Sequence, residues 1–151
     1  MRGTVLGLVM GGCAIARCLA PAGAEAGSTA APVIHLECEI AQSGGKISAE
    51  MLCEAMQGSL ARVAPEVRTE PAAGGSEASL VLAVQVTKAG QSGLTGHLQW
   101  HSAKAPGLRN SPDVQFSAMD AQLNSAMLGG FTDALIAADP GFLAVLDALR
   151  R

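Results

Sequence analysis

The chain has 151 residues, of which 49% are hydrophobic and 15% are charged, and its formal net charge is −3. That length fits one ordinary domain with a buried core. The acidic balance argues against nucleic acid or an anionic membrane as the main partner, because both bind clustered Lys and Arg. Arg150-Arg151 is the one pair of adjacent basic residues in the sequence.

Residues 1–26 have the features of an export signal that is cleaved. Arg2 precedes an uncharged, mostly apolar run, and small residues then lead to an A-x-A pattern at 24–26, which a signal peptidase recognises. The apolar run ends at Arg17, so it is shorter than the ~20 residues that a membrane-spanning helix needs. We therefore predict cleavage before Gly27, a mature chain with no transmembrane segment, and localisation in the periplasm or outside the cell.

A second interpretation of the same segment is lipid attachment at Cys13. Met10-Gly11-Gly12-Cys13 is a poor match to a lipobox, because Met stands where Leu is usual. In this alternative the chain is a lipoprotein, acylated at Cys13 and tethered to the envelope.

Residues 27–32 form a leader of small residues that we expect to be flexible, as chain termini tend to be, and residues 33–151 predict a single domain. Val33–Ile40 alternates strictly between apolar and polar side chains. This period of two indicates a half-buried strand, with Cys38 toward the core and His35 on the opposite face.

A helix follows, from an N-cap at Ser48 to about Val63, with Cys53 on its apolar stripe. An exported chain that keeps two cysteines is expected to oxidise them. We predict a structural disulfide between Cys38 and Cys53, and closing a loop of about fifteen residues stabilises a fold by ~3 kcal/mol.

The middle of the chain predicts strands. Val67–Thr69 is a short edge strand, and Leu80–Thr87 and Leu94–His101 alternate around a Gly-containing turn, which is typical of a β-hairpin. Pro and Gly residues in 102–112 predict a loop. Val114–Phe116 is a further candidate strand.

The last third predicts two helices. The first begins near an N-cap at Asp120, and the Gly129-Gly130 pair inside it predicts either a kink or close backbone packing. Asp139 followed by Pro140 is the usual order of cap and first residue for a second helix. Apolar residues at every fourth position form the core face of the first helix: Leu123, Met127, Phe131 and Leu135.

The element order β-α-(β)-β-β-(β)-α-α predicts an α+β fold. We expect a two-layer sandwich, with a mostly antiparallel sheet of three to five strands and helices packed on one face. The other face is then left toward solvent or a partner.

That open face carries the candidate interaction residues His35, His97, Gln99 and His101. At about 3.4 Å per residue, His97 and His101 stand roughly 13 Å apart on one strand, too far for both to bind one metal ion. This spacing argues against a metal site. The sequence also contains no G-x-S-x-G, Walker-type G-x-x-x-x-G-K-[ST], H-E-x-x-H or C-x-x-C motif, so we predict no cofactor and no catalytic residue.

We interpret the chain as a binding or accessory module of a bacterial cell envelope without catalytic activity, with an envelope protein or peptide as its partner. Two alternatives stay open. One is a small periplasmic hydrolase or metal-dependent enzyme that uses the histidine-bearing face, and the other is a structural lipoprotein acylated at Cys13.

Overall fold

The computed structural model describes residues 30–42, 46–73, 77–119 and 121–151. The predicted export signal at 1–26, Cys13 and Asp120 lie outside the described residues. Within those ranges the chain forms six strands and three helices. In chain order they are β1 (Val33–Ile40), α1 (Ala49–Val63), β2 (Arg68–Pro71), β3 (Leu80–Ala89), β4 (Gly93–Ser102), β5 (Ala105–Asn110), β6 (Val114–Ser117), α2 (Ser125–Ala137) and α3 (Pro140–Leu149).

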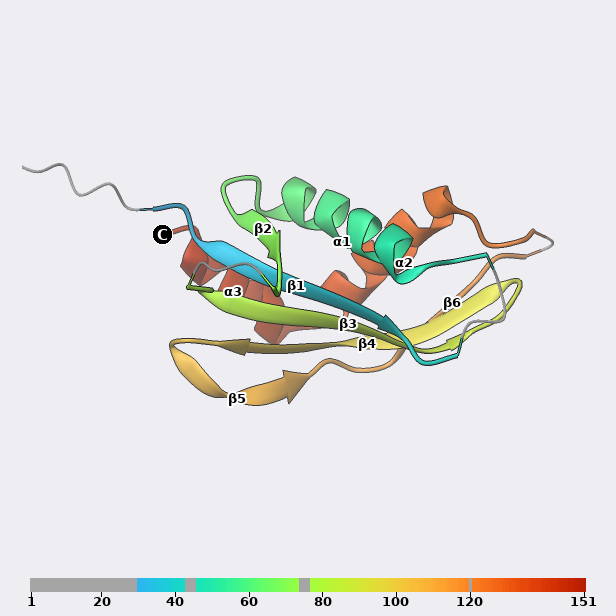
Figure 1. The fold of residues 1–151 in the computed structure, drawn as a ribbon. Helices are drawn as coiled ribbons and strands as arrows, with labels where there is room; N and C mark the ends of the chain where they lie inside the picture. Colours follow the sequence, from blue (N-terminus) through green and yellow to red (C-terminus); the bar gives the residue numbers. More distant parts are fainter. Residues whose placement is uncertain (1–29, 43–45, 74–76, 120) are drawn as a thin grey trace, which may run out of the picture.

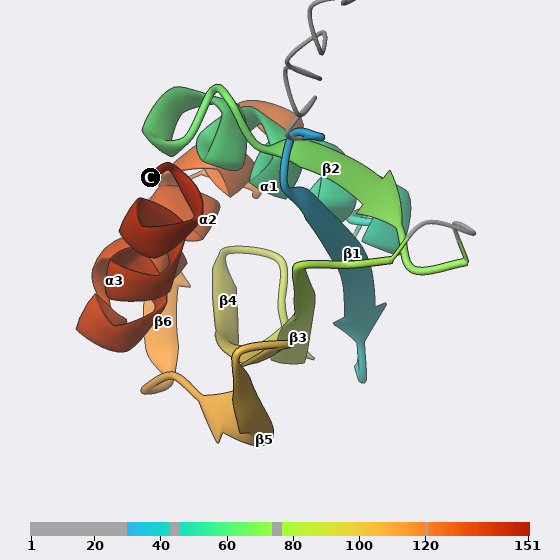
Figure 2. The same ribbon diagram turned by 90° about the vertical axis from the view of Figure 1, so that its left-hand side faces the viewer.

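The strands form one mixed sheet in the order β2-β1-β3-β4-β5, and β6 also pairs with β4. β1 runs parallel to β2 and β3, whereas the β3–β4, β4–β5 and β4–β6 pairs are antiparallel. The helices cover one side of the sheet (Figure 1), and the end-on view in Figure 2 shows that the strands curve around them. The predicted α+β class is confirmed, with six described strands instead of three to five.

β5 corrects the predicted loop over 102–112. Ala105–Asn110 pairs antiparallel with β4, where Arg109 lies opposite Trp100. An edge strand tolerates Pro because one of its sides needs no backbone donor. Gly107 has φ 122°, a conformation that L side chains rarely adopt. The Pro and Gly residues that predicted a loop are therefore part of an irregular edge strand.

α2 begins later than predicted. Its N-cap is Asn124, whose side chain accepts the Met127 N–H at 3.1 Å. The helix then runs through its glycine pair to Ala137. A Cβ on Gly130 would lie 3.4 Å from the ring of Phe116, so this glycine lies beside β6 at a distance that a small side chain could also occupy.

The core lies between the helices and the inner face of the sheet. Leu82, Val84 and Leu98 are fully buried there. Gly96 on β4 lets the sheet and α2 approach, since a Cβ at this position would lie 2.4 Å from the Gln85 carbonyl oxygen and 3.2 Å from Cζ of Phe131. Burial of this apolar surface is the main stabilising contribution to the fold.

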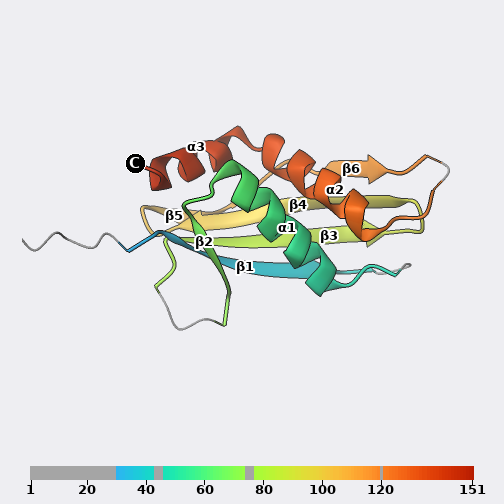
Figure 3. The same cartoon turned by 90° about the horizontal axis from the view of Figure 1, so that it is seen from above.

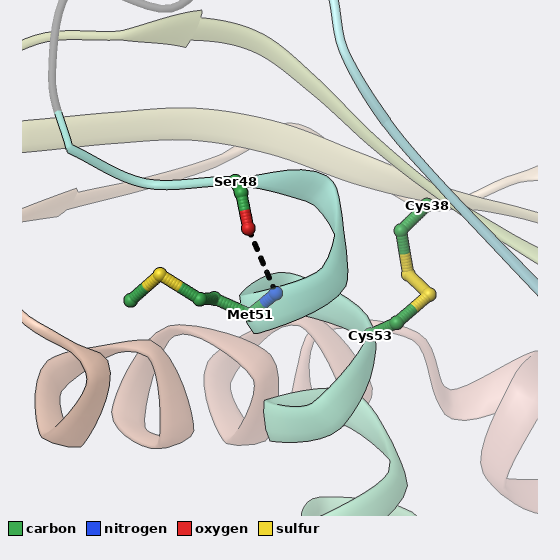
Figure 4. Close-up of a disulfide and its surroundings, with 4 residues drawn as sticks. All are labelled: Cys38, Ser48, Met51 and Cys53. Carbon is green, nitrogen blue, oxygen red and sulfur yellow. Dashed lines mark hydrogen bonds between the residues drawn. A yellow bond between two sulfur atoms is a disulfide. The ribbon is translucent and has the colours of Figure 1, made fainter.

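The predicted disulfide attaches α1 to the sheet. Figure 4 shows Cys53 on α1 joined to Cys38 on β1. The two Cα atoms are 5.7 Å apart, within the usual range for a disulfide. The predicted N-cap is also confirmed, because the Ser48 hydroxyl accepts the Met51 N–H at 3.3 Å.

Polar side chains connect α1 to α2, which lie side by side over the sheet in Figure 3. The hydroxyls of Ser59 and Thr132, both fully buried, share a hydrogen bond of 2.7 Å. Arg62 donates to Ser59 and pairs with Asp133 at 2.7 Å. The Ser59 hydroxyl and, after it, the Arg62 guanidinium lower the pKa of Asp133 below its ordinary value of 3.8.

A single carboxylate attaches α3 to the sheet. Asp139 caps α3 by accepting the Phe142 N–H at 2.9 Å, and its other oxygen accepts the Trp100 indole N–H at 2.8 Å. The rings of Trp100 and Phe142 lie with their centroids 6.0 Å apart. The predicted cap at Asp139 is confirmed, and its contact with the sheet is an additional finding.

Candidate interaction face

The outer face of the sheet, opposite the helices, carries the residues that the sequence marks as a candidate site. Along β4, and along β3 from Leu80 to Thr87, the side chains alternate between buried positions and more exposed ones. This alternation follows from the pleat of a strand. The inner positions form the core, so the outer positions are open to a partner.

Strand register sets which outer side chains are neighbours. On β4, His97 lies opposite Gln85, Gln99 opposite Ala83 and His101 opposite Val81. β1 continues these rows, with Glu39 beside Gln85, Glu37 beside Ala83 and His35 beside Val81. His35 and His101 therefore end one row, and His97 lies two rows away.

Two amides meet at the centre of this face. The Gln85 Nε2 donates to the Gln99 Oε1 at 3.0 Å. This bond uses one N–H of Gln85 and the carbonyl oxygen of Gln99. The remaining carbonyl of Gln85 and the remaining N–H groups of Gln99 can therefore accept from and donate to a partner.

His97 has an acidic partner that sequence reasoning missed. Its Nδ1 lies 3.0 Å from Oδ1 of Asp113, and the His97 side chain is 17% exposed. Asp113 precedes β6, which pairs with β4 so that Gly96 faces Val114. No local sequence signal marks this contact, because it depends on the long-range pairing of β6. A carboxylate on Nδ1 orients the ring and leaves Nε2 for an outside group.

The other two histidines differ in accessibility. His101 is exposed on the outer face. His35 is buried, at 9% exposed, and lies opposite Glu70 of β2 in the strand register. The accessible part of the candidate face is therefore carried by β4, through His97, Gln99 and His101.

β1 adds negative charge to one side of the face. The side chains of Glu37 and Glu39 are exposed. They border a shallow hollow of about 400 Å³ that Ala83 and Gln85 also line. Within the described ranges, no group of three or more His, Cys, Asp or Glu side chains is arranged to hold a metal ion. The face therefore offers a partner hydrogen-bonding side chains, with two carboxylates at one side.

These features define the class of the molecule: an α+β domain with one sheet face under helices and one open, polar face. No protein-family model matches the chain, and no curated protein matches it by sequence. Among the parts of the chain that the structure describes, no helix has both the length and the hydropathy to cross a membrane.

By fold, the chain is similar to PelC of Paraburkholderia phytofirmans, seen as a dodecamer. That structure and a dodecamer of a PelC variant each align with a TM-score of 0.55 and 12% identity, over 72% of this chain and 86% of theirs. A chain from Caulobacter crescentus CB15, named as a lipoprotein, aligns at 15% identity over 76% of this chain and 87% of its own. Its TM-score of 0.27 is too low to support an argument. The likeness to PelC shows a shared fold.

Proposed function

We propose that this chain is an exported, non-catalytic binding module of a bacterial cell envelope, which contacts a protein or peptide partner through the outer face of its sheet. One observation carries the proposal. The side chains of His97, Gln99 and His101 lie along the outer face of β4, in a domain whose other sheet face is buried under helices. The export features of residues 1–26 support the compartment.

The composition of the face favours a polar partner surface over a small apolar ligand. Its amides and imidazoles pair with main-chain and side-chain groups of another protein, and such contacts are typical of non-obligate interfaces. The fold that this chain shares with the PelC dodecamer makes a second copy of the chain one partner to test.

A photo-crosslinking residue tests the proposal directly. Placed at Gln99, it is expected to capture a partner of defined mass in the envelope fraction. The same residue at Glu54, which is exposed on α1, is the matched control and is expected to capture none. Light scattering of the purified mature chain tells whether the partner is a second copy.

Substitutions then separate this face from the rest of the surface. The variant with Ala at His97, Gln99 and His101 is expected to lose the adduct formed from a crosslinker at the neighbouring Gln85. Capture that persists unchanged in this folded variant contradicts the proposal. Stoichiometric metal in the purified chain would favour an enzyme that uses the same face.

A further inference from the structure

A groove of about 670 Å³ lies at the opposite end of the molecule from the β3–β4 turn. It is formed where β1 begins, β4 turns into β5 and α3 ends, three segments that lie together at the left of Figure 1. None of the candidate interaction residues on the outer sheet face lines it. Its volume is within the range of small-molecule pockets.

The walls of this groove are mostly apolar. The last turns of α3 present Val145, Ala148 and Leu149, whose spacing places them on one side of the helix. Pro32 and Ala103 also line the groove, and Ser79 and Ser102 are the polar residues among these walls. Such walls offer little to the main-chain N–H and C=O groups of a peptide, which need hydrogen-bond partners when buried. They suit a hydrocarbon chain.

The groove also has a cationic rim. Lys104, Arg150 and Arg151 all line it, together with one acidic residue, Glu66. Arg150 pairs with Glu66 and Arg151 pairs with Asp147. Lys104 is exposed and forms no ion pair among the described residues. Lys104 is therefore available to bind an anionic group at the edge of the apolar groove.

We infer that this groove binds a single-chain fatty carboxylate, with the hydrocarbon chain along α3 and the carboxylate at Lys104. The charge of the rim matches that of the head group, and the apolar walls match the chain. A groove is concave, whereas a bilayer surface is flat, so the ligand is a monomer that has left the bilayer. Each additional methylene that enters the groove is expected to tighten binding about fourfold.

Calorimetric titration of the mature chain tests the inference with decanoate, laurate and myristate at concentrations below micelle formation. We expect one saturable site and tighter binding as the chain lengthens. Ala148→Trp fills the groove and is expected to weaken laurate binding at least tenfold. Ala144→Trp is the matched control, since Ala144 is exposed one turn earlier on α3 and does not line the groove.

Charge reversal tests the head group separately. Lys104→Glu is expected to weaken laurate binding about tenfold and to leave binding of dodecanol unchanged. Lys88→Glu, at an exposed lysine of β3 outside the groove, is expected to change neither. A thermal melt of each variant shows that it is folded.

Four results would overturn the inference. One is the absence of saturable laurate binding, and another is equal binding by Ala148→Trp and Ala144→Trp. The third is binding to phosphatidylglycerol vesicles without binding to monomeric laurate, which would assign the rim to a membrane surface. Loss of a dimer or larger assembly in Ala148→Trp, with no laurate bound by the original chain, would assign the groove to a second copy.

Discussion

Asp139→Ala is expected to detach α3 from the sheet. Asp139 is 8% exposed, and its carboxylate accepts two hydrogen bonds, one from the Phe142 N–H and one from the Trp100 indole. Losing an N-cap costs about 1 kcal/mol. A buried indole N–H left without an acceptor costs about 1–3 kcal/mol. We therefore expect the free energy of unfolding to fall by about 2–4 kcal/mol.

Urea unfolding measures this change. Trp100 is the single tryptophan of the chain, so its fluorescence reports the environment that Asp139 helps to form. With an m-value of about 2 kcal/mol per molar urea, the unfolding midpoint is expected to fall by about 1–2 M. Circular dichroism followed in the same titration tests whether the transition remains two-state.

Asp147→Ala is the matched control on the same helix. Asp147 pairs with Arg151 one turn away, and its side chain is 52% exposed. Exposed pairs of this kind contribute about 0.3–0.5 kcal/mol. If Asp139→Ala destabilises the protein no more than Asp147→Ala does, the two buried hydrogen bonds do not hold α3 in place.

Three further changes test other parts of the fold. Gly96→Ala places a methyl group against the Gln85 carbonyl and is expected to lower stability by about 1–3 kcal/mol in urea unfolding; an unchanged midpoint would contradict the close approach of β3, β4 and α2. Replacing both Cys38 and Cys53 with Ala is expected to lower stability by ~3 kcal/mol, which reduction of the original chain should reproduce. The pKa of Asp133 is lowered in the folded chain, so its contribution is present above the unfolded pKa and is lost as pH falls through the folded pKa. Asp133→Asn is expected to lower stability by less than about 1 kcal/mol at neutral pH, because the pair with Arg62 is exposed. The difference between this variant and the original chain should disappear at low pH. A difference that grows at low pH would be inconsistent with the lowered pKa of Asp133.

Local patterns predicted much of the fold. The disulfide was predicted from two cysteines left in an exported chain. The alternation along β1, which placed Cys38 toward the core, and the helical stripe, which carried Cys53, agreed with that pairing. The caps at Ser48 and Asp139 were also predicted, because each side chain satisfies N–H groups within its own helix turn. Such signals need only a few neighbouring residues.

Long-range pairing could not be predicted in the same way. β5 contains Pro106 and Gly107, and what makes it a strand is its pairing with β4. The contact between His97 and Asp113 likewise depends on how β6 pairs with β4. Alternation assigned His35 to the outer face, but it could not show that β2 brings Glu70 opposite it in the register.

The start of α2 shows a different limit. Asp120 and Asn124 are both residue types that cap helices, and Met127, Phe131 and Leu135 of the apolar stripe follow both of them. Leu123 extends that stripe toward the earlier candidate, yet the observed helix begins at Ser125. Composition alone could not choose between two adequate caps.

The measurement that tests the central claim most directly is the intact mass of the chain recovered from the envelope fraction without reducing agent. An exported module is expected to begin at Gly27 and to weigh two hydrogens less than its reduced form, with Cys38 and Cys53 protected from alkylation. An acylated Cys13 at the N-terminus would show a tethered lipoprotein instead. Full-length chain in the cytosol, with both of these thiols open to alkylation, would contradict the claim.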